Sequence, residues 1–127
     1  MAAYEIDGEL YVTKPGEIIS PDGGFYSYDE KYSADSHSIT KVEAQGLSEE
    51  QHKLIRLYSE TIFTQMRLRH LARIDFFLTK EGEIYLNEVN TFPGMTPISM
   101  FPKMLENNGH TYRSFLESCI RNGWLIA

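Results

Sequence analysis

Apolar and polar residues alternate along several short segments of the chain, and turn-forming residues separate these segments. In residues 4–12, YEIDGELYV, the pair Asp7-Gly8 lies between two alternating runs. An Asp-Gly pair favours a two-residue hairpin, because such turns need the positive φ that glycine accepts. We predict a β-hairpin here and short strands at about residues 17–20 and 38–44.

A helical period of about 3.6 residues replaces this alternation in residues 49–68. Ser48 and Gln51 match the pattern of a capping box, and Leu47 occupies the hydrophobic staple position. The repeating positions are Leu54, Leu57, Tyr58, Thr61, Ile62, Gln65 and Met66. We predict a helix over residues 49–68 that buries this face.

Two shorter helical patterns lie near the carboxyl end. Ser99 is placed to cap the first, which Gly109 ends, and Thr111 is placed to cap the second, which Gly123 ends. The apolar face predicted for the second helix consists of Tyr112, Phe115, Leu116, Cys119 and Ile120. Cys119 is predicted to be a core residue rather than a reactive thiol, because no basic neighbour would activate it.

Residues 21–38, PDGGFYSYDEKYSADSHS, follow neither period. The stretch has the size of an Ω-loop, and loops this long in compact domains are usually functional or disordered. Its aromatic residues favour a loop packed by its own side chains over a solvated linker. We therefore predict a functional loop.

Polar residues interrupt the two apolar runs of a second predicted hairpin, residues 71–79 and 83–90. They are Arg73 and Asp75 in the first run, and Glu88 and Asn90 in the second. Because side chains alternate between the faces of a strand, each polar pair lies on one face of its own strand. Phe77 shares that face on the first strand, and Leu86 shares it on the second.

The turn decides whether these two faces coincide. A loop that pairs Leu78 with Glu83 would place Asp75 opposite Leu86 and diagonal to Glu88, on one side of the sheet. A three-residue loop without a compensating bulge would separate the carboxylates. Clustering is favoured, because a shared cation neutralises carboxylates that are otherwise costly on a half-buried sheet.

The candidate metal ligands are the oxygen atoms of Asp75, Glu88 and Asn90. Such hard ligands suit Mg²⁺ or Mn²⁺ rather than zinc, and Mg²⁺ commonly completes its coordination with phosphate oxygens. Arg73 would then hold a transferring phosphoryl group. The alternative is that these residues form surface salt bridges on an edge strand.

The segment that follows, NTFPGMTPISM, favours a binding site over salt bridges. We predict a turn at Pro93-Gly94, whose amides could bind an oxyanion, and a helix start at Ser99, which could bind a carboxylate. Metal ligands, arginine, amide turn and helix start together suit the activation of a carboxylate by a nucleotide phosphate.

Composition limits the class of protein. A chain of 127 residues with 42% hydrophobic residues can bury one modest core, so we expect one domain. A net charge of −6 argues against nucleic-acid binding, which relies on clustered Lys and Arg. One cysteine cannot form an intrachain disulfide, and no segment has the apolar length of a membrane span or secretory signal. We expect a cytoplasmic protein that binds neither nucleic acid nor membranes.

Three segments resemble one known family. ARIDFFL and YLNEVNTFPGMTPISMFP closely resemble the carboxyl-terminal part of D-alanine:D-alanine ligases of the ATP-grasp superfamily, and FYSYDEKYSAD resembles their Ω-loop. The resemblance implies an α+β fold, with an antiparallel sheet flanked by helices, as the C-terminal half of an ATP-grasp fold. It also implies a reaction in which ATP phosphorylates the carboxylate of one D-alanine and a second D-alanine attacks the acylphosphate. The product is the dipeptide used in peptidoglycan.

The resemblance implies roles for the residues of the second hairpin and the loop after it. Asp75, Glu88 and Asn90 would bind two Mg²⁺ or Mn²⁺ ions. Arg73 and the backbone amide of Gly94 would stabilise the tetrahedral transition state.

Further roles follow from the same resemblance. Ser99 and the amide of Met100 would bind the carboxylate of the second D-alanine, and Phe77 would contact adenine. Lys31 would contact the transferred phosphate, and Tyr32 would help the Ω-loop to close and exclude water.

The resemblance also implies what this chain lacks. Residues 1–127 would be the C-terminal part of the catalytic domain, without the amino-terminal and central ATP-binding domains, and the abrupt start of the first strand suggests a cut. The parent enzyme would be a homodimer that uses D-alanine and ATP, and this chain alone would be inactive. The alternatives are a ligase with D-lactate or D-serine as acceptor, and a non-catalytic module whose acidic hairpin is structural or binds a cation.

Overall fold

A four-stranded antiparallel sheet in the order β2-β1-β5-β6 forms the centre of the molecule. The computed structural model describes residues 1–19 and 39–123. The strands of this sheet are β1 (Ala2–Ile6), β2 (Glu9–Val12), β5 (Leu71–Leu78) and β6 (Ile84–Asn90). A separate antiparallel ribbon pairs β3 (Glu17–Ile19) with β4 (Ile39–Lys41), and the helices are α2 (Glu49–Gln65), α3 (Met100–Asn107) and α4 (Tyr112–Gly123).

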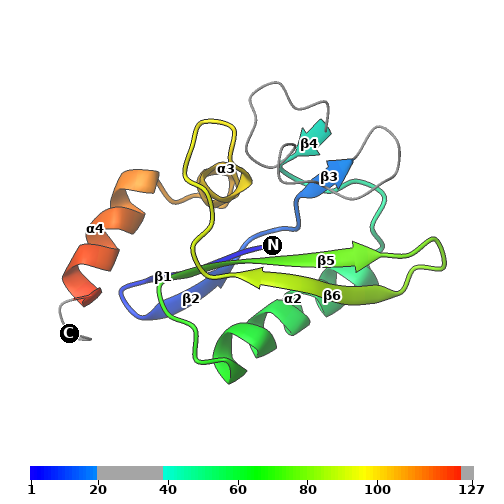
Figure 1. The fold of residues 1–127 in the computed structure, drawn as a ribbon, viewed down its shortest axis with the longest axis horizontal. Coiled ribbons are helices and arrows are strands. Elements are labelled where there is room, and N and C mark those ends of the chain that lie inside the picture. Colours follow the sequence, from blue (N-terminus) through cyan, green and yellow to red (C-terminus); the bar gives the residue numbers. More distant parts are fainter. Residues whose placement is uncertain (20–38, 124–127) are drawn as a thin grey trace.

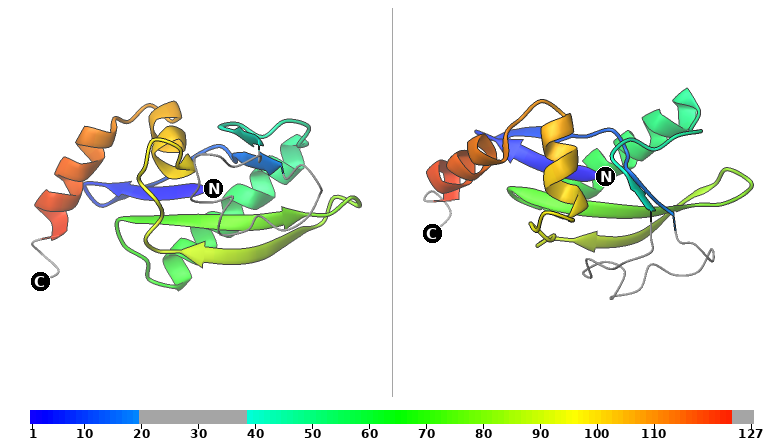
Figure 2. Two further views of the ribbon diagram at one scale, coloured as in Figure 1. Left: turned by 45° about the horizontal axis from the view of Figure 1, so that its top comes forward. Right: turned by 90° about the horizontal axis from the view of Figure 1, so that it is seen from above.

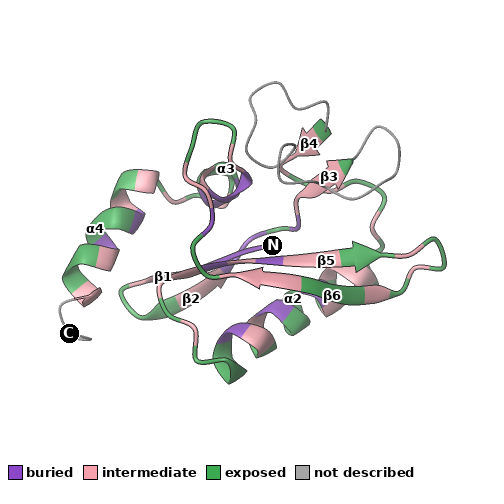
Figure 3. Cartoon of the chain, viewed as in Figure 1, coloured by how far each residue is buried: buried purple, intermediate pink, exposed green. Residues whose placement is uncertain are grey.

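Helices cover both faces of the sheet. Figures 1 and 2 show α2 on one face and α3 and α4 on the other. A core cluster lies on each side, because neighbouring residues of β1 point to opposite faces: Ala3 packs with α2, and Ala2 and Tyr4 pack with α3 and α4. Figure 3 shows that the buried residues gather along these two interfaces. The arrangement confirms the predicted α+β fold.

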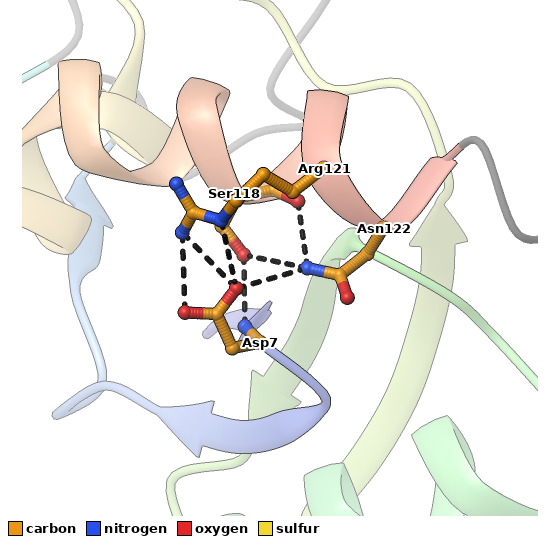
Figure 4. A network of polar contacts seen from close by, with 4 residues as sticks. All are labelled: Asp7, Ser118, Arg121 and Asn122. Carbon is orange, nitrogen blue, oxygen red and sulfur yellow. Dashed lines mark hydrogen bonds and ion pairs between the residues drawn. The ribbon is translucent and has the colours of Figure 1, made fainter.

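The first hairpin forms as predicted. Asp7 and Gly8 have φ values of 50° and 86°, so both adopt the left-handed conformation that a type I′ turn requires. The Asp7 carboxylate accepts hydrogen bonds from Arg121 and Asn122, and its amide donates to Ser118 Oγ at 2.8 Å. Figure 4 shows this network, which joins the tip of the hairpin to α4.

The start of α2 is also confirmed. Gln51 N donates to Ser48 Oγ at 3.1 Å, and Ser48 N donates to Gln51 Oε1 at 2.9 Å, which completes the capping box. The helix ends at Gln65, earlier than the predicted residue 68, because Arg67 adopts a positive φ of 54°.

The buried face of α2 differs from the prediction. Ile55, Ser59 and Phe63 are buried, whereas Leu57 and Met66 are each 55% exposed. Ser59 was not part of the predicted stripe, but its hydroxyl donates to Ile55 O at 2.8 Å and is thereby satisfied inside the core. The face of α2 that contacts the sheet is thus rotated about the helix axis relative to the predicted stripe.

The prediction of the apolar face of α4 is also only partly correct. Phe115 is buried and Cys119 packs half-buried against the core, but Leu116 is 40% exposed and Ile120 is 77% exposed. Ser118 is buried in their place, because this side of α4 meets the Asp7 turn. Burial raises the pKa of the Cys119 thiol, which agrees with an unreactive residue. The predicted Thr111 cap is confirmed, since Thr111 Oγ1 accepts from Ser114 N at 3.0 Å.

In the two described ranges, no helix combines the length and the apolar character needed to cross a membrane.

Candidate active site on the β5–β6 hairpin

The register of β5 and β6 places the candidate ligands. Thr79 N donates to Glu83 O at 2.9 Å, so residues 80–82 form a three-residue loop, with Gly82 at a φ of +87°. The pairing Leu78↔Ile84 continues to Phe76↔Leu86 and then shifts to Asp75↔Glu88. Asn87 is the extra residue of this β-bulge.

The bulge decides on which face each side chain lies. Of the alternatives left open, Leu78 pairs with Ile84 and not with Glu83. The prediction that Leu86 shares a face with Glu88 is wrong, because Leu86 pairs with Phe76 on the α2 side. Asp75 and Glu88 nevertheless lie directly opposite each other on one face. The three-residue loop alone would have separated them, and the bulge compensates for it.

The Arg73 side chain joins the two carboxylates. Its Nε and Nη2 donate to Oδ1 and Oδ2 of Asp75 at 2.9 and 3.0 Å, and Nη2 lies 3.5 Å from Glu88 Oε1. The Arg73 and Asp75 side chains are only 12% and 18% exposed, whereas that of Glu88 is 43% exposed. Arg73 pairs with Ala2, so the group lies on the α3 side of the sheet.

The fourth residue of the group, Asn90, pairs with Arg73 across the strands. Its Oδ1 accepts a hydrogen bond from Phe92 N at 3.0 Å, which holds the bend at the end of β6. The carbonyl oxygen of an amide has a second lone pair, which remains a possible metal ligand. Asn90 therefore both ends the strand and extends the row of oxygen atoms.

The loop after β6 differs from the prediction. The chain bends at Thr91 and Phe92, rather than turning at Pro93-Gly94, and its hydrogen-bonded turn lies further on, where Ser99 N donates to Thr96 O at 3.0 Å. Gly94 is half-buried within this loop.

Ser99 occupies the N-cap position of α3, but its hydroxyl does not cap the helix. Ser99 Oγ instead accepts from Thr96 N at 3.0 Å and lies 2.7 Å from Thr96 Oγ1. The first-turn amides of α3 are therefore not occupied by this side chain, and such amides favour a negatively charged ligand. Met100, the first residue of α3, buries its side chain in the core, which fixes the helix start.

The residues of the hairpin fit a divalent cation. Both carboxylates contact one guanidinium, so they already surround a positive charge, and all their ligand atoms are oxygen. Within residues 1–19 and 39–123, no three His, Cys, Asp or Glu residues gather in a metal-binding group. A third ligand from this hairpin would therefore be the amide oxygen of Asn90.

Two aromatic residues extend the same face of the hairpin. Phe77 and Tyr85 pair across the strands and are 47% and 54% exposed. Tyr85 was not predicted from the sequence, because its place opposite Phe77 depends on the length of the loop. Lys31 and Tyr32, and the whole predicted Ω-loop, lie outside the described residues.

Comparisons with known proteins point to one family. The family described as "D-ala D-ala ligase C-terminus" matches residues 2–121. A D-alanine--D-alanine ligase of Vibrio campbellii is 72% identical over 120 residues, which are 94% of this chain and 36% of the relative. The chain thus spans about a third of that enzyme.

Solved structures agree with this match. The D-alanyl-alanine synthetase A of Vibrio cholerae is 64% identical, with a TM-score of 0.84 over 95% of this chain and 36% of its own. A D-alanine--D-alanine ligase of Bacillus anthracis, solved with ATP, is 26% identical, with a TM-score of 0.68 over 98% of this chain and 39% of its own. The chain therefore belongs to the D-alanine–D-alanine ligase family, whose carboxyl-terminal part it matches.

Proposed function

We propose that residues 1–127 are the C-terminal part of the catalytic domain of an ATP-grasp ligase that joins two D-alanines in the cytoplasm. In the parent enzyme, ATP would phosphorylate the carboxylate of the first D-alanine. The amine of the second would attack the acylphosphate carbon, and phosphate would leave as the peptide bond forms. The amino-terminal and central domains of the parent would supply the remainder of the ATP and substrate sites.

The observation that carries the proposal is the arrangement of Arg73, Asp75 and Glu88. One guanidinium lies within ion-pair distance of two carboxylates on adjacent strands. A positive group that would bind phosphate and two negative groups that would bind metal therefore lie together on the sheet. A structural salt bridge would need only one carboxylate for one arginine. The family match at these same strands supports the functional interpretation.

Each residue has a proposed role. Asp75, Glu88 and Asn90 would hold Mg²⁺ or Mn²⁺, two ions in the parent site, and such ions would supply charge neutralisation for the phosphates. Arg73 and the amide of Gly94 bind the oxygen atoms that gain charge in the transition state.

The substrate-binding roles lie on neighbouring segments. Ser99 and the Met100 amide bind the acceptor carboxylate at the start of α3, and Phe77 lines one side of the adenine pocket. Lys31 contacts the transferred phosphate and Tyr32 helps the loop to exclude water from the acylphosphate.

A chimaeric enzyme tests the proposal. We would replace the matching carboxyl-terminal part of the Vibrio cholerae synthetase with this chain, since the two are 64% identical there. The expected result is ATP-dependent release of phosphate together with D-alanyl-D-alanine, measured by a coupled assay and mass spectrometry. D-serine and D-lactate as alternative acceptors would show whether this part of the enzyme accepts a different second substrate.

A matched variant identifies the site. Glu88→Gln in the chimaera removes a charge while it preserves side-chain volume, and it should reduce turnover by at least about a hundredfold without loss of fold. Glu81→Gln, in the exposed loop of the same hairpin, should leave turnover unchanged. A folded chimaera that forms no product with any acceptor would refute the proposed function, and a fully active Glu88→Gln chimaera would refute the metal assignment.

A further inference from the structure

Arg73 contacts the carboxylates at the same oxygen atoms that a metal ion would need. Both Oδ atoms of Asp75 accept hydrogen bonds from this one guanidinium, at 2.9 and 3.0 Å, and Glu88 Oε1 lies 3.5 Å from Nη2. A metal ion approaching Asp75 from this side therefore meets a carboxylate that is already bonded in a bidentate manner. While Arg73 donates to Asp75, the lone pairs that face the guanidinium are not available to a metal on that side of the carboxylate.

The pair of Arg73 with Asp75 is shorter, and its arginine is less exposed, than in the pair that Arg69 forms with Glu5 of β1. Arg69 reaches Glu5 at 3.4 Å through an arginine side chain that is 54% exposed, whereas the Arg73 side chain is 12% exposed. Two parallel charge-assisted bonds in a partly dry site are more stable than one contact in water. A metal that replaces Arg73 must therefore overcome a substantial interaction.

We infer that Arg73 and the metal compete for Asp75 and Glu88. Without metal, the guanidinium keeps the two carboxylates together on the hairpin. When a divalent cation binds, Arg73 leaves Asp75, and its donors become available to the oxygen atoms of a phosphoryl group. Metal entry and release of the arginine for catalysis are then one event, which prevents the arginine from capturing phosphate before the metal is in place.

This inference rests on the proposed function, because the metal is the one implied by the family. It also makes a prediction that the proposed function does not make. If Arg73 only stabilises the transition state, its replacement lowers turnover and leaves metal affinity almost unchanged. If Arg73 competes with the metal, its replacement strengthens metal binding in the chain itself, with no nucleotide or substrate present.

Titration with Mn²⁺, followed by electron paramagnetic resonance of the free ion at constant pH, measures this affinity directly. The Arg73→Gln chain should bind Mn²⁺ at least about fivefold more tightly than the unchanged chain, given the strength of hydrogen bonds to charged groups. Arg69→Gln removes the same charge from an exposed arginine that precedes β5 and pairs with Glu5, and it should change the affinity by less than about twofold. Arg73→Lys retains the charge without the planar fork, and we expect an intermediate affinity.

The outcomes separate the two proposals. Equal or weaker Mn²⁺ binding by Arg73→Gln refutes the competition, and it leaves the metal site intact if Glu88→Gln still weakens binding. If Glu88→Gln binds Mn²⁺ as well as the unchanged chain, or if no chain binds Mn²⁺, the metal site itself is wrong and the competition is wrong with it.

A second measurement allows for a loss of stability in the Arg73→Gln chain. Asp75 loses its partner in Arg73→Gln, so this chain should unfold at a lower temperature without metal. Mn²⁺ should then raise its Tm by more than it raises the Tm of the unchanged chain, because at one ligand concentration a tighter ligand stabilises the folded state more, by an amount that grows with the logarithm of the affinity. An equal or smaller rise would refute the competition. If Arg73→Gln stays unfolded at every Mn²⁺ concentration, Arg73→Lys is compared with the unchanged chain instead. Tighter Mn²⁺ binding by Arg73→Lys then supports the competition, and equal or weaker binding refutes it.

Discussion

At the scale of single residues, the amino group of Met1 is an unusual feature of the core. Its nitrogen donates to Ile74 O at 2.8 Å in a buried position, beside the Asp75 and Arg73 pair. Burial lowers the pKa of this group from 8.0 to about 6; Asp75 opposes the change and Arg73 adds to it. In a polypeptide of these 127 residues alone, the fold therefore disfavours protonation of the Met1 amino group.

This burial predicts that the stability of the chain depends on pH. Between the folded pKa of about 6 and the unfolded pKa of 8.0, the unfolded state binds more protons, so the free energy of unfolding should rise with pH across this window. A shift of this size corresponds to roughly 3 kcal/mol at most. Urea unfolding at pH 6, 7 and 8 measures it. Acetylation of the amino group should remove this part of the slope, and an unchanged slope after acetylation would assign it to other groups.

At the scale of secondary-structure elements, the β3–β4 ribbon packs closely against α3 at a glycine. Gly16 lies in the link between β2 and β3, and a Cβ atom there would be 2.8 Å from Met100 Cε and 3.1 Å from Lys41 O. The methionine end can move, but the Lys41 carbonyl belongs to the backbone of β4. The ribbon that flanks the predicted Ω-loop thus packs against the first turn of α3, where the acceptor carboxylate is proposed to bind.

The change Gly16→Ala should therefore destabilise the chain by about 1–3 kcal/mol, because the added methyl group overpacks this contact. In the chimaera it should raise the KM for the acceptor more than it lowers kcat, because it disturbs the start of α3 and leaves the hairpin unchanged. Gly123→Ala is the matched control, since a Cβ there meets no atom within 4 Å. Equal stability of the two variants, measured by chemical unfolding, would contradict the tight packing at Gly16.

The contact between the first hairpin and α4 also leads to a prediction. Asp7 provides both the left-handed turn residue and the acceptor for Arg121 and Asn122 (Figure 4). The change Asp7→Asn keeps a residue that tolerates this conformation but removes the charge, whereas Asp7→Ala removes both. We expect the Tm to fall in the order unchanged chain, Asp7→Asn, Asp7→Ala. High salt should reduce the Tm difference between the unchanged chain and Asp7→Asn more than the difference between Asp7→Asn and Asp7→Ala, because salt screens the ion pair. A chain with Asp7→Ala that melts with the unchanged chain would refute this role.

At the scale of the whole molecule, the chain spans about 36% of the Vibrio campbellii ligase, and its aromatic face is open. In the proposed function, Phe77 and Tyr85 would provide only one side of a nucleotide pocket, and a ligand held on one side gains little of the burial that tight binding needs. We predict no phosphate release from ATP with D-alanine by the chain alone, and no nucleotide binding tighter than roughly millimolar. Isothermal titration and a phosphate assay measure both. Robust turnover by the chain alone would show that the remaining two thirds of the relatives are not required.

Much of the fold could be predicted because its signals are local. The Asp7-Gly8 turn, the capping box of α2 and the Thr111 cap each depend on residues within three positions of one another, and all three formed. The motif of β5 and β6 similarly identified Arg73, Asp75, Glu88 and Asn90 before any register was known. A local sequence motif can therefore identify candidate site residues without the structure.

The tertiary structure decided the features that depend on distant residues. A bulge at Asn87 brings Asp75 and Glu88 to one face, because it compensates for the three-residue loop, and alternation within a strand contains no sign of it. The buried faces of α2 and α4 were misassigned, because two small polar residues are satisfied inside the core: Ser59 donates to Ile55 O of its own helix, and Ser118 accepts from Asp7 N of the distant hairpin. Sequence alone determined which residues are candidates for the site, and the pairing of distant segments decided which of them meet.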